Sequence, residues 1–151
     1  MASRSAGIAG HEAVIAAVGA ALAGDAPVPR DAMAEAVRAL AGELRLRHGG
    51  RTIEVRVPPF AAVQLAGAAG AGPHHTRGTP PNVVETDPAT FVRLATGLLT
   101  WTQAQATGVL RCSGSHAHET ASYLPLAPLT APVFAASEHA GDAIPSSDPV
   151  T

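Results

Sequence analysis

The spacing of apolar residues changes abruptly within residues 30–57, and this change most constrains what the chain can fold into. Before Gly49 and Gly50, four apolar residues recur at intervals that place them on one face of a helix: Met33, Val37, Leu40 and Leu44. After the glycines, apolar and polar residues alternate in "RTIEVRV", which is the pattern of a strand with one buried face. A helix that leads directly into such a strand predicts helices packed against a sheet.

Proline and glycine divide the rest of the chain into short elements. A first helix is predicted over residues 10–23, and two prolines within residues 24–30 separate it from the second helix. A proline pair also ends the first strand, and the following "FAAVQLAG" predicts a second strand that pairs antiparallel with the first. Residues 67–81 form a loop that is long for a small domain.

The segment "HTRGTPPNVVETDP", residues 75–88, is predicted to lead stiffly into a strand. Its proline pair favours an extended backbone and offers no N–H groups, so the strand begins only with "NVVET". Asp87 followed by Pro88 is typical of a helix start. The apolar residues of that predicted helix are Phe91, Leu94, Ala95 and Leu98. Thr100 begins a second short helix, "VLRCS" predicts the last strand, and "ETASYLPL" predicts a short helix or a turn.

These elements predict an α+β domain with helices on one face of a mostly antiparallel sheet. The 151 residues suit a single domain, which we assign to residues 10–129. Residues 1–9 are predicted to be a flexible N-terminus. Residues 130–151 have no hydrophobic period and are rich in proline, serine and alanine, which predicts a disordered tail.

Composition argues against several classes of function. The formal net charge is -2, which disfavours a nucleic-acid partner, and the absence of lysine excludes a Walker-type phosphate loop and Schiff-base chemistry. The single cysteine cannot form an internal disulfide and suits a reducing compartment. No apolar run reaches the roughly 18–20 residues that cross a bilayer, and "AVIAAVGAALAGDA" is interpreted as an amphipathic helix rather than an export signal. We therefore expect a cytoplasmic protein without stable membrane insertion.

Four blocks stand out together: "EVRVPPFAAVQ", "HTRGTPPNVVETDP", "LATGLLTWTQAQATG" and the closing "LPL". Over about residues 30–126 the chain resembles a short bacterial branch of the sterol carrier protein (type two) family. The resemblance implies about five strands with helices on one side. It also implies an apolar tunnel for a sterol, fatty acid or acyl-CoA, and a carrier role without catalysis or cofactor. The chain departs from the branch after "CSG", where "SHAHET" with His116 and His118 replaces an Arg-Ala-Asp-like run.

The candidate ligand-binding residues are Arg77, Thr79, Asn82, Phe91, Leu94, Leu98 and Trp101. The guanidinium of Arg77 would bind a carboxylate or phosphate head group at the mouth of a cavity, although a structural ion pair with Glu85 or Glu54 is the favoured interpretation. The two polar neighbours carry the same ambiguity, because turn-forming side chains usually bond their own backbone. The four apolar residues would line the tunnel, and plain core packing is the alternative.

Histidine and cysteine are the other residue types that could bind a metal ion or act as a nucleophile. No metal site is predicted from the histidines, because no cysteine or carboxylate lies at matching spacing: His74, His75, His116 and His118. Cys112 shares the predicted buried face of its strand with Leu110, so it is interpreted as a small core residue rather than a nucleophile.

Two functions follow from these observations. The first is a non-catalytic binding module that carries a lipid-like hydrophobic molecule in an apolar tunnel. The second is an accessory domain that acts in trans with an enzyme such as a thiol-dependent isomerase, because sterol-carrier-like modules occur attached to such enzymes. An enzyme partner or a homodimer is expected beside the small molecule. The sequence presents no Ser-His-Asp set or carboxylate pair, so no catalytic residue is predicted.

Overall fold

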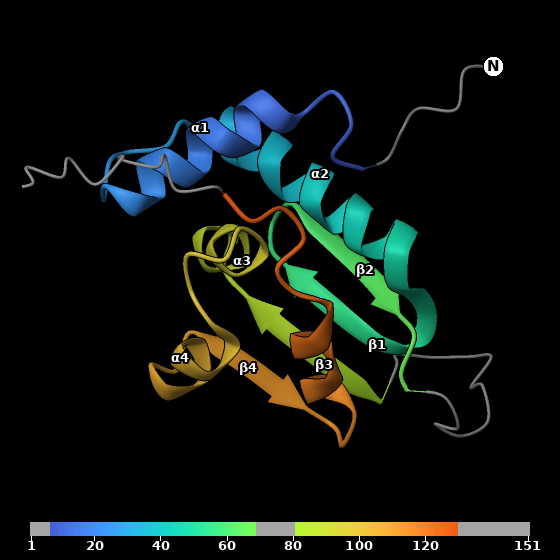
Figure 1. The fold of residues 1–151 in the computed structure, drawn as a ribbon. Helices are drawn as coiled ribbons and strands as arrows, with labels where there is room; N and C mark the ends of the chain where they lie inside the picture. The colour runs from blue at the N-terminus through green and yellow to red at the C-terminus, as the bar shows by residue number, and fades with distance from the viewer. Residues whose placement is uncertain (1–6, 69–80, 130–151) are drawn as a thin grey trace, which may run out of the picture.

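The computed structural model describes residues 7–68 and 81–129, in which helices and strands form separate layers (Figure 1). The helices are α1 (Glu12–Ala23), α2 (Arg30–His48), α3 (Pro88–Ala95), α4 (Trp101–Ala106) and the 3₁₀ helix η1 (Ala117–Tyr123). The strands are β1 (Gly49–Val57), β2 (Ala61–Leu65), β3 (Asn82–Thr86) and β4 (Leu110–Ser113). Each helix and strand predicted from the sequence is present, which confirms the α+β class.

The sheet of the described residues has four strands in the order β2-β1-β3-β4. The expectation of about five strands is therefore wrong for this part of the chain. The sheet is also mixed, because β1 pairs antiparallel with β2 but parallel with β3, while β3 and β4 are antiparallel. The parallel pair has a simple cause. β2 runs back to the end of the sheet at which β1 begins, and β3 starts from that same end. β3 therefore runs in the same direction as β1.

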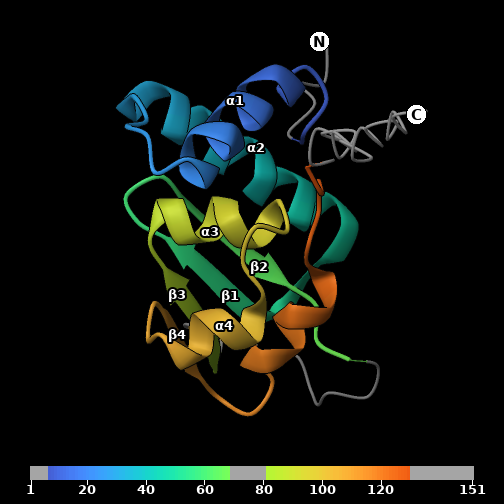
Figure 2. The ribbon, with the colours of Figure 1, turned by 60° about the vertical axis from the view of Figure 1, so that its left-hand side comes forward.

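The helices lie over one face of the sheet, and Figure 2 shows α2 and α3 between α1 and the strands. The core between these layers is built from small and medium side chains. On the strand side, Ile53, Val55 and Val57 are at most 2% exposed, as their alternation predicted. On the helix side, Val37, Leu40 and Leu44 are fully buried, whereas Met33 at the start of the same stripe is only partly buried. The predicted helical face is confirmed.

The opposite face of the sheet carries polar side chains that alternate with the core residues. Glu54, Arg56 and Glu85 lie there side by side on β1 and β3, and Arg56 Nε donates to Glu54 Oε1 at 2.8 Å. Among the described residues no helix lies over this face (Figures 1 and 2). No helix in the same part of the chain is long and apolar enough to cross a membrane.

Capping residues stabilise the starts of α3 and α4, the two helices that follow β3. The Asp87 carboxylate accepts hydrogen bonds from the backbone N–H and the hydroxyl of Thr90, at 2.9 and 2.7 Å, and Pro88 occupies the first helical turn. Thr100 and Gln103 form a reciprocal capping box at the start of α4. Both starts confirm the sequence prediction.

The end of α3 does not follow the prediction. The helix stops at Ala95, and Gly97 adopts a φ of 79°, a left-handed conformation that glycine tolerates best. Leu98 therefore lies outside the helix and is 39% exposed, so the predicted extension of the apolar stripe to Leu98 was wrong. Residues 1–6 of the predicted flexible N-terminus, the tail over residues 130–151 and residues 69–80 of the long loop fall outside the described residues, so these calls stay predictions.

Candidate functional site

The apolar residues predicted to wall a tunnel divide into two groups. Phe91 and Leu94 are 2% and 3% exposed and pack within the common core of α3, α2 and the sheet. Trp101 is only partly buried and packs against that core from α4, while Leu98 points outside it. The structure therefore brings Phe91, Leu94 and Trp101 to one side of the sheet and separates Leu98 from them. Their contact with a ligand stays a prediction.

Among the described residues, the last two helices, α4 and η1, cover the β3–β4 side of the sheet. α4 lies against β4, and η1 lies against both β3 and β4 (Figures 1 and 2). The side chains that these two helices bury are few and small: Ala104, Ala117 and Thr120. The two aromatic side chains of these helices, Trp101 and Tyr123, are only partly buried against the core. We therefore take the contact of α4 and η1 with the sheet as the candidate ligand region.

Asn82 fixes one end of this region. Its side chain is 3% exposed, Nδ2 donates to the carbonyl of Thr52 on β1 at 3.0 Å, and Oδ1 accepts from the backbone N–H of His116 at 2.9 Å. One amide thus ties the start of η1 to the sheet. Gly114 passes so close to Asn82 and Pro81 that a side chain there would collide with their atoms. Asn82 has a structural role, and a direct role in ligand binding is untested.

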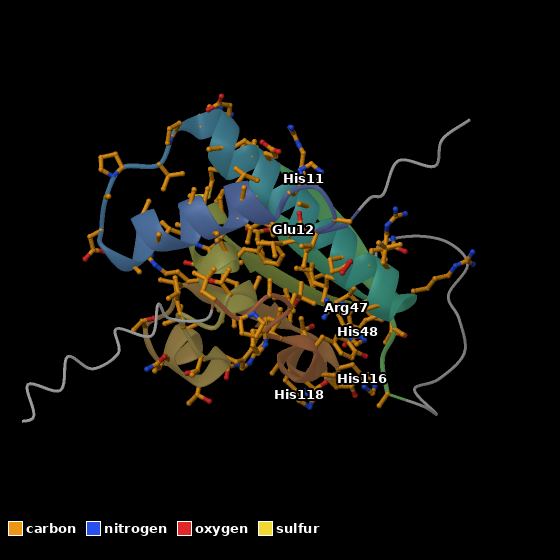
Figure 3. The ribbon with its side chains drawn as sticks, turned by 45° about the horizontal axis from the view of Figure 1, so that its top comes forward. His11, Glu12, Arg47, His48, His116 and His118 are labelled. Atoms are coloured by element: carbon orange, nitrogen blue, oxygen red, sulfur yellow. The ribbon has the colours of Figure 1, made fainter. Side chains whose placement is uncertain are left out.

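A cluster of polar and aromatic side chains surrounds η1, and we name it the η1 cluster: His48, His116, Glu119 and Tyr123. His116 Nδ1 and Glu119 Oε1 lie 2.8 Å apart, and Glu119 Oε2 accepts from the backbone N–H of Ala68 at 2.7 Å. Tyr123 stacks on the ring of His48 with centroids 4.1 Å apart, and its hydroxyl donates to the carbonyl of Ala66 at 2.7 Å. In Figure 3 the label of His48, at the end of α2, stands next to that of His116, the residue before η1.

Two members of the η1 cluster, Glu119 and Tyr123, have shifted pKa values. The hydrogen bond from His116, followed by the one from the Ala68 backbone, lowers the pKa of the Glu119 carboxyl from its ordinary value. Burial, with a smaller effect of the Glu119 charge, raises the pKa of the Tyr123 hydroxyl. At neutral pH the cluster therefore contains a carboxylate and an un-ionised phenol. The cluster was not predicted from the sequence, because His48 and the backbone partners Ala66 and Ala68 lie far along the chain from residues 116–123.

Thr120 carries the strongest local indication of a ligand. The residue is 1% exposed, and its Oγ1 has no hydrogen-bond partner among the described residues. A buried hydroxyl without a partner costs about 1–3 kcal/mol, and folded proteins keep few of them. A ligand hydroxyl or carboxylate would satisfy this group. Thr120 was not predicted either, since nothing in "HETASY" distinguishes a buried threonine from an exposed one.

Cys112 is exposed, so its interpretation as a core residue was wrong. Its strand partner Val84 is buried, but β4 is an edge strand, and the polar Gln105 of α4 is the neighbour of the thiol. Partial burial raises the pKa of the Cys112 thiol, which Gln105 offsets in part. The thiolate, which is the nucleophilic form, is therefore disfavoured at neutral pH.

The remaining candidates are placed as follows. Arg77, Thr79 and the two histidines of the long loop lie outside the described residues, so their predicted roles are untested. Residues 7–68 and 81–129 hold no group of three side chains that could bind a metal ion. Glu54, one proposed structural partner of Arg77, already pairs with Arg56.

Three grooves formed by described residues lie away from the apolar residues that were predicted to line a tunnel. One of about 480 Å³ lies between α2 and β2, and one of about 530 Å³ lies on the polar face of the sheet beside Pro58 and Pro59. The third, of about 330 Å³, lies between Asp87 and Gly108 at the carboxyl end of β3. None of the three is lined by Phe91, Leu94 or Trp101.

The chain matches a known protein family. Residues 29–126, well over half of the chain, match the family described as a bacterial SCP ortholog. The chain belongs to this bacterial sterol carrier protein-like family. The match extends from the residue before α2 to three residues beyond η1, so it includes the whole sheet, the η1 cluster and Thr120. It confirms the resemblance seen in the sequence and leaves α1 outside the matched region. No curated protein matches the chain significantly.

Proposed function

We propose that this member of the sterol carrier protein-like family is a non-catalytic carrier of one lipid-like molecule of the sterol, fatty acid or acyl-CoA class. The observation that carries the proposal is the family match over residues 29–126, since the family suggests lipid binding. The match contains every element of the sheet and the helices α2, α3 and α4. The carrier acts in the cytoplasm, where its single cysteine stays reduced.

The ligand is proposed to lie under α4 and η1, between these helices and strands β3 and β4. Two features support this position. The side chains that the two helices fully bury there are small, whereas Trp101 and Tyr123 are only partly buried against the core. The Thr120 hydroxyl would donate a hydrogen bond to a ligand oxygen, which would remove the cost of leaving it unpaired. Trp101 and Phe91 would supply aromatic contacts to the apolar part of the ligand.

The carrier role requires no reaction, and the described residues support this assignment. The Cys112 thiol has a raised pKa, so it is a poor nucleophile. The carboxylate of Glu119 is held by His116 and the backbone of Ala68 instead of being poised to accept a proton.

Ligand retention tests the proposal directly. Protein that has been unfolded, extracted with organic solvent and refolded is mixed with oleate, cholesterol or palmitoyl-CoA and examined by native mass spectrometry. We expect one ligand per chain for at least one class. A ligand at about one hundred times its Kd adds about 2.7 kcal/mol of stability, which raises the Tm by several degrees. The absence of any complex, together with a Tm change below about 1 °C for all three classes, refutes the proposal.

A further inference from the structure

The segment that contains η1 is attached to the rest of the fold at its two ends. At its start, the Asn82 side chain accepts a hydrogen bond from the backbone N–H of His116 at 2.9 Å. At its other end, the backbone N–H of Leu126 donates to the carbonyl of Ala95 on α3 at 2.8 Å. Between these points, within the described part of the chain, the backbone of residues 117–125 forms no hydrogen bond with the backbone of another helix or strand.

Two side chains hold the segment between its ends, and both bind residues that follow β2. Glu119 Oε2 accepts from the backbone N–H of Ala68 at 2.7 Å, and the Tyr123 hydroxyl donates to the carbonyl of Ala66 at 2.7 Å. We call these two hydrogen bonds the latches. The Tyr123 ring also stacks on the ring of His48. Segments with few backbone hydrogen bonds to their neighbours open at a lower free energy than the strands of a sheet, so we expect η1 to open while the sheet stays folded.

The proposed ligand position requires such an opening. Thr120 is 1% exposed, so a ligand atom reaches its hydroxyl only when neighbouring atoms move away. None of the three grooves formed by described residues is lined by a residue of α4 or η1, so these grooves give a ligand no path to the hydroxyl. η1 itself carries Thr120, and Ala117 is its only other buried residue. An outward movement of η1 therefore exposes the hydroxyl that we assign to the ligand.

We propose that η1 is the gate through which the lipid enters and leaves. This inference rests on the proposed function, because a gate requires a ligand to admit. In the closed state the two latches join η1 to Ala66 and Ala68. When both latches break, η1 moves outward between its attachments at His116 and Leu126, and the lipid enters beside β3 and β4. The latches bind no ligand, so they set how fast the lipid enters and leaves but not how tightly it is held.

Hydrogen exchange of the delipidated full chain tests the opening without any ligand. In wild type, we expect the amides of residues 117–124 to exchange faster than those of β1, because a partial opening releases them. Tyr123→Phe removes one latch and keeps the ring that stacks on His48, so it should accelerate the exchange of the η1 amides about three- to tenfold. Glu119→Ala removes the other latch and should act in the same direction.

Thr96→Val serves as the comparison variant, because the Thr96 hydroxyl also donates to a backbone carbonyl, that of Val92 on α3, at 2.7 Å. This bond stays intact when η1 alone opens and breaks only when the fold is lost. Thr96→Val should therefore accelerate the exchange of the β1 amides about three- to tenfold and leave that of the η1 amides unchanged. If it accelerates both sets equally, or if the two sets exchange at the same rate in wild type, η1 opens only with global unfolding and the gate is overturned.

Binding kinetics test what the opening does. The probe is cis-parinaric acid, a fluorescent fatty acid that accepts excitation energy from Trp101, the single tryptophan. Tyr123→Phe should raise the association and dissociation rate constants by the same factor, about three- to tenfold, and leave the Kd within about twofold of wild type. Unchanged rate constants, or a change in Kd without a matched rise in both rate constants, overturn the gate while the carrier function stands. A chain that binds neither this probe nor any of the three lipids named above fails as a carrier, and the gate fails with it.

Discussion

Replacing Thr120 with valine removes the buried hydroxyl that has no hydrogen-bond partner among the described residues and keeps the branched shape of the side chain. In the ligand-free protein the change should therefore stabilise the fold, which is unusual for a buried substitution. In the ligand complex the same change removes the donor that we assign to the ligand. The two effects have opposite consequences for the protein, so one variant tests the local structure and the proposed function together.

The magnitude follows from the burial of the hydroxyl. Thr120 is 1% exposed, so nearly the whole cost of an unpaired hydroxyl, about 1–3 kcal/mol, is removed when valine replaces it. Thr96 provides a matched control, because it is 2% exposed but its hydroxyl donates to the carbonyl of Val92 at 2.7 Å. Thr96→Val should destabilise the protein by about 0.5–1.5 kcal/mol. The same chemical change is thus expected to have opposite signs at two buried threonines.

Urea denaturation of the delipidated protein measures both values. Trp101 is the single tryptophan and is partly buried, so its fluorescence reports unfolding, and far-UV circular dichroism provides a second probe. Equal m-values would show that neither variant changes the surface exposed on unfolding. For a ligand with a hydroxyl or carboxylate, Thr120→Val is expected to weaken binding about three- to tenfold, whereas Thr96→Val leaves the affinity unchanged.

A loss of stability in Thr120→Val as large as that in Thr96→Val would refute this reasoning, because it would mean that the Thr120 hydroxyl is satisfied in the ligand-free protein. An internal water would be the simplest source of that bond. Stabilisation without any change in ligand affinity would keep the structural argument but remove Thr120 from the ligand site.

Three further predictions concern single residues. Asp87→Ala removes both hydrogen bonds to Thr90 at the start of α3 and should lower the free energy of unfolding by about 1 kcal/mol, with Asp87→Asn closer to wild type, as measured by urea denaturation. The folded pKa of Glu119 is lowered from its ordinary value of 4.5, so its contribution to stability is present above about pH 4.5 and is lost as the pH falls through the folded pKa. The stability difference between wild type and Glu119→Gln should therefore shrink on acidification, and a difference that is constant with pH would contradict the pairing with His116. Cys112 should react with iodoacetamide more slowly at neutral pH than a free cysteine, and faster reaction would show that its thiol pKa is not raised.

The sequence predicts those parts of the fold that depend on neighbouring residues. The alternation of Ile53, Val55 and Val57 and the capping residues Asp87 and Thr100 act within a few positions, and the structure confirms all of them. The parallel pairing of β1 with β3 could not be inferred in the same way. It depends on which end of the sheet the chain has reached after β2, and no local pattern records that.

The candidate site depends even more on contacts between residues that are distant in sequence. The η1 cluster joins His48 with Tyr123 and joins Glu119 with Ala68, and these pairs are distant in sequence. Cys112 was misplaced because alternation assigns a face of the sheet but cannot show whether helices cover that face at an edge strand. Thr120 could not be identified from the sequence, because the burial of a single polar residue in a short 3₁₀ helix depends on what packs around it.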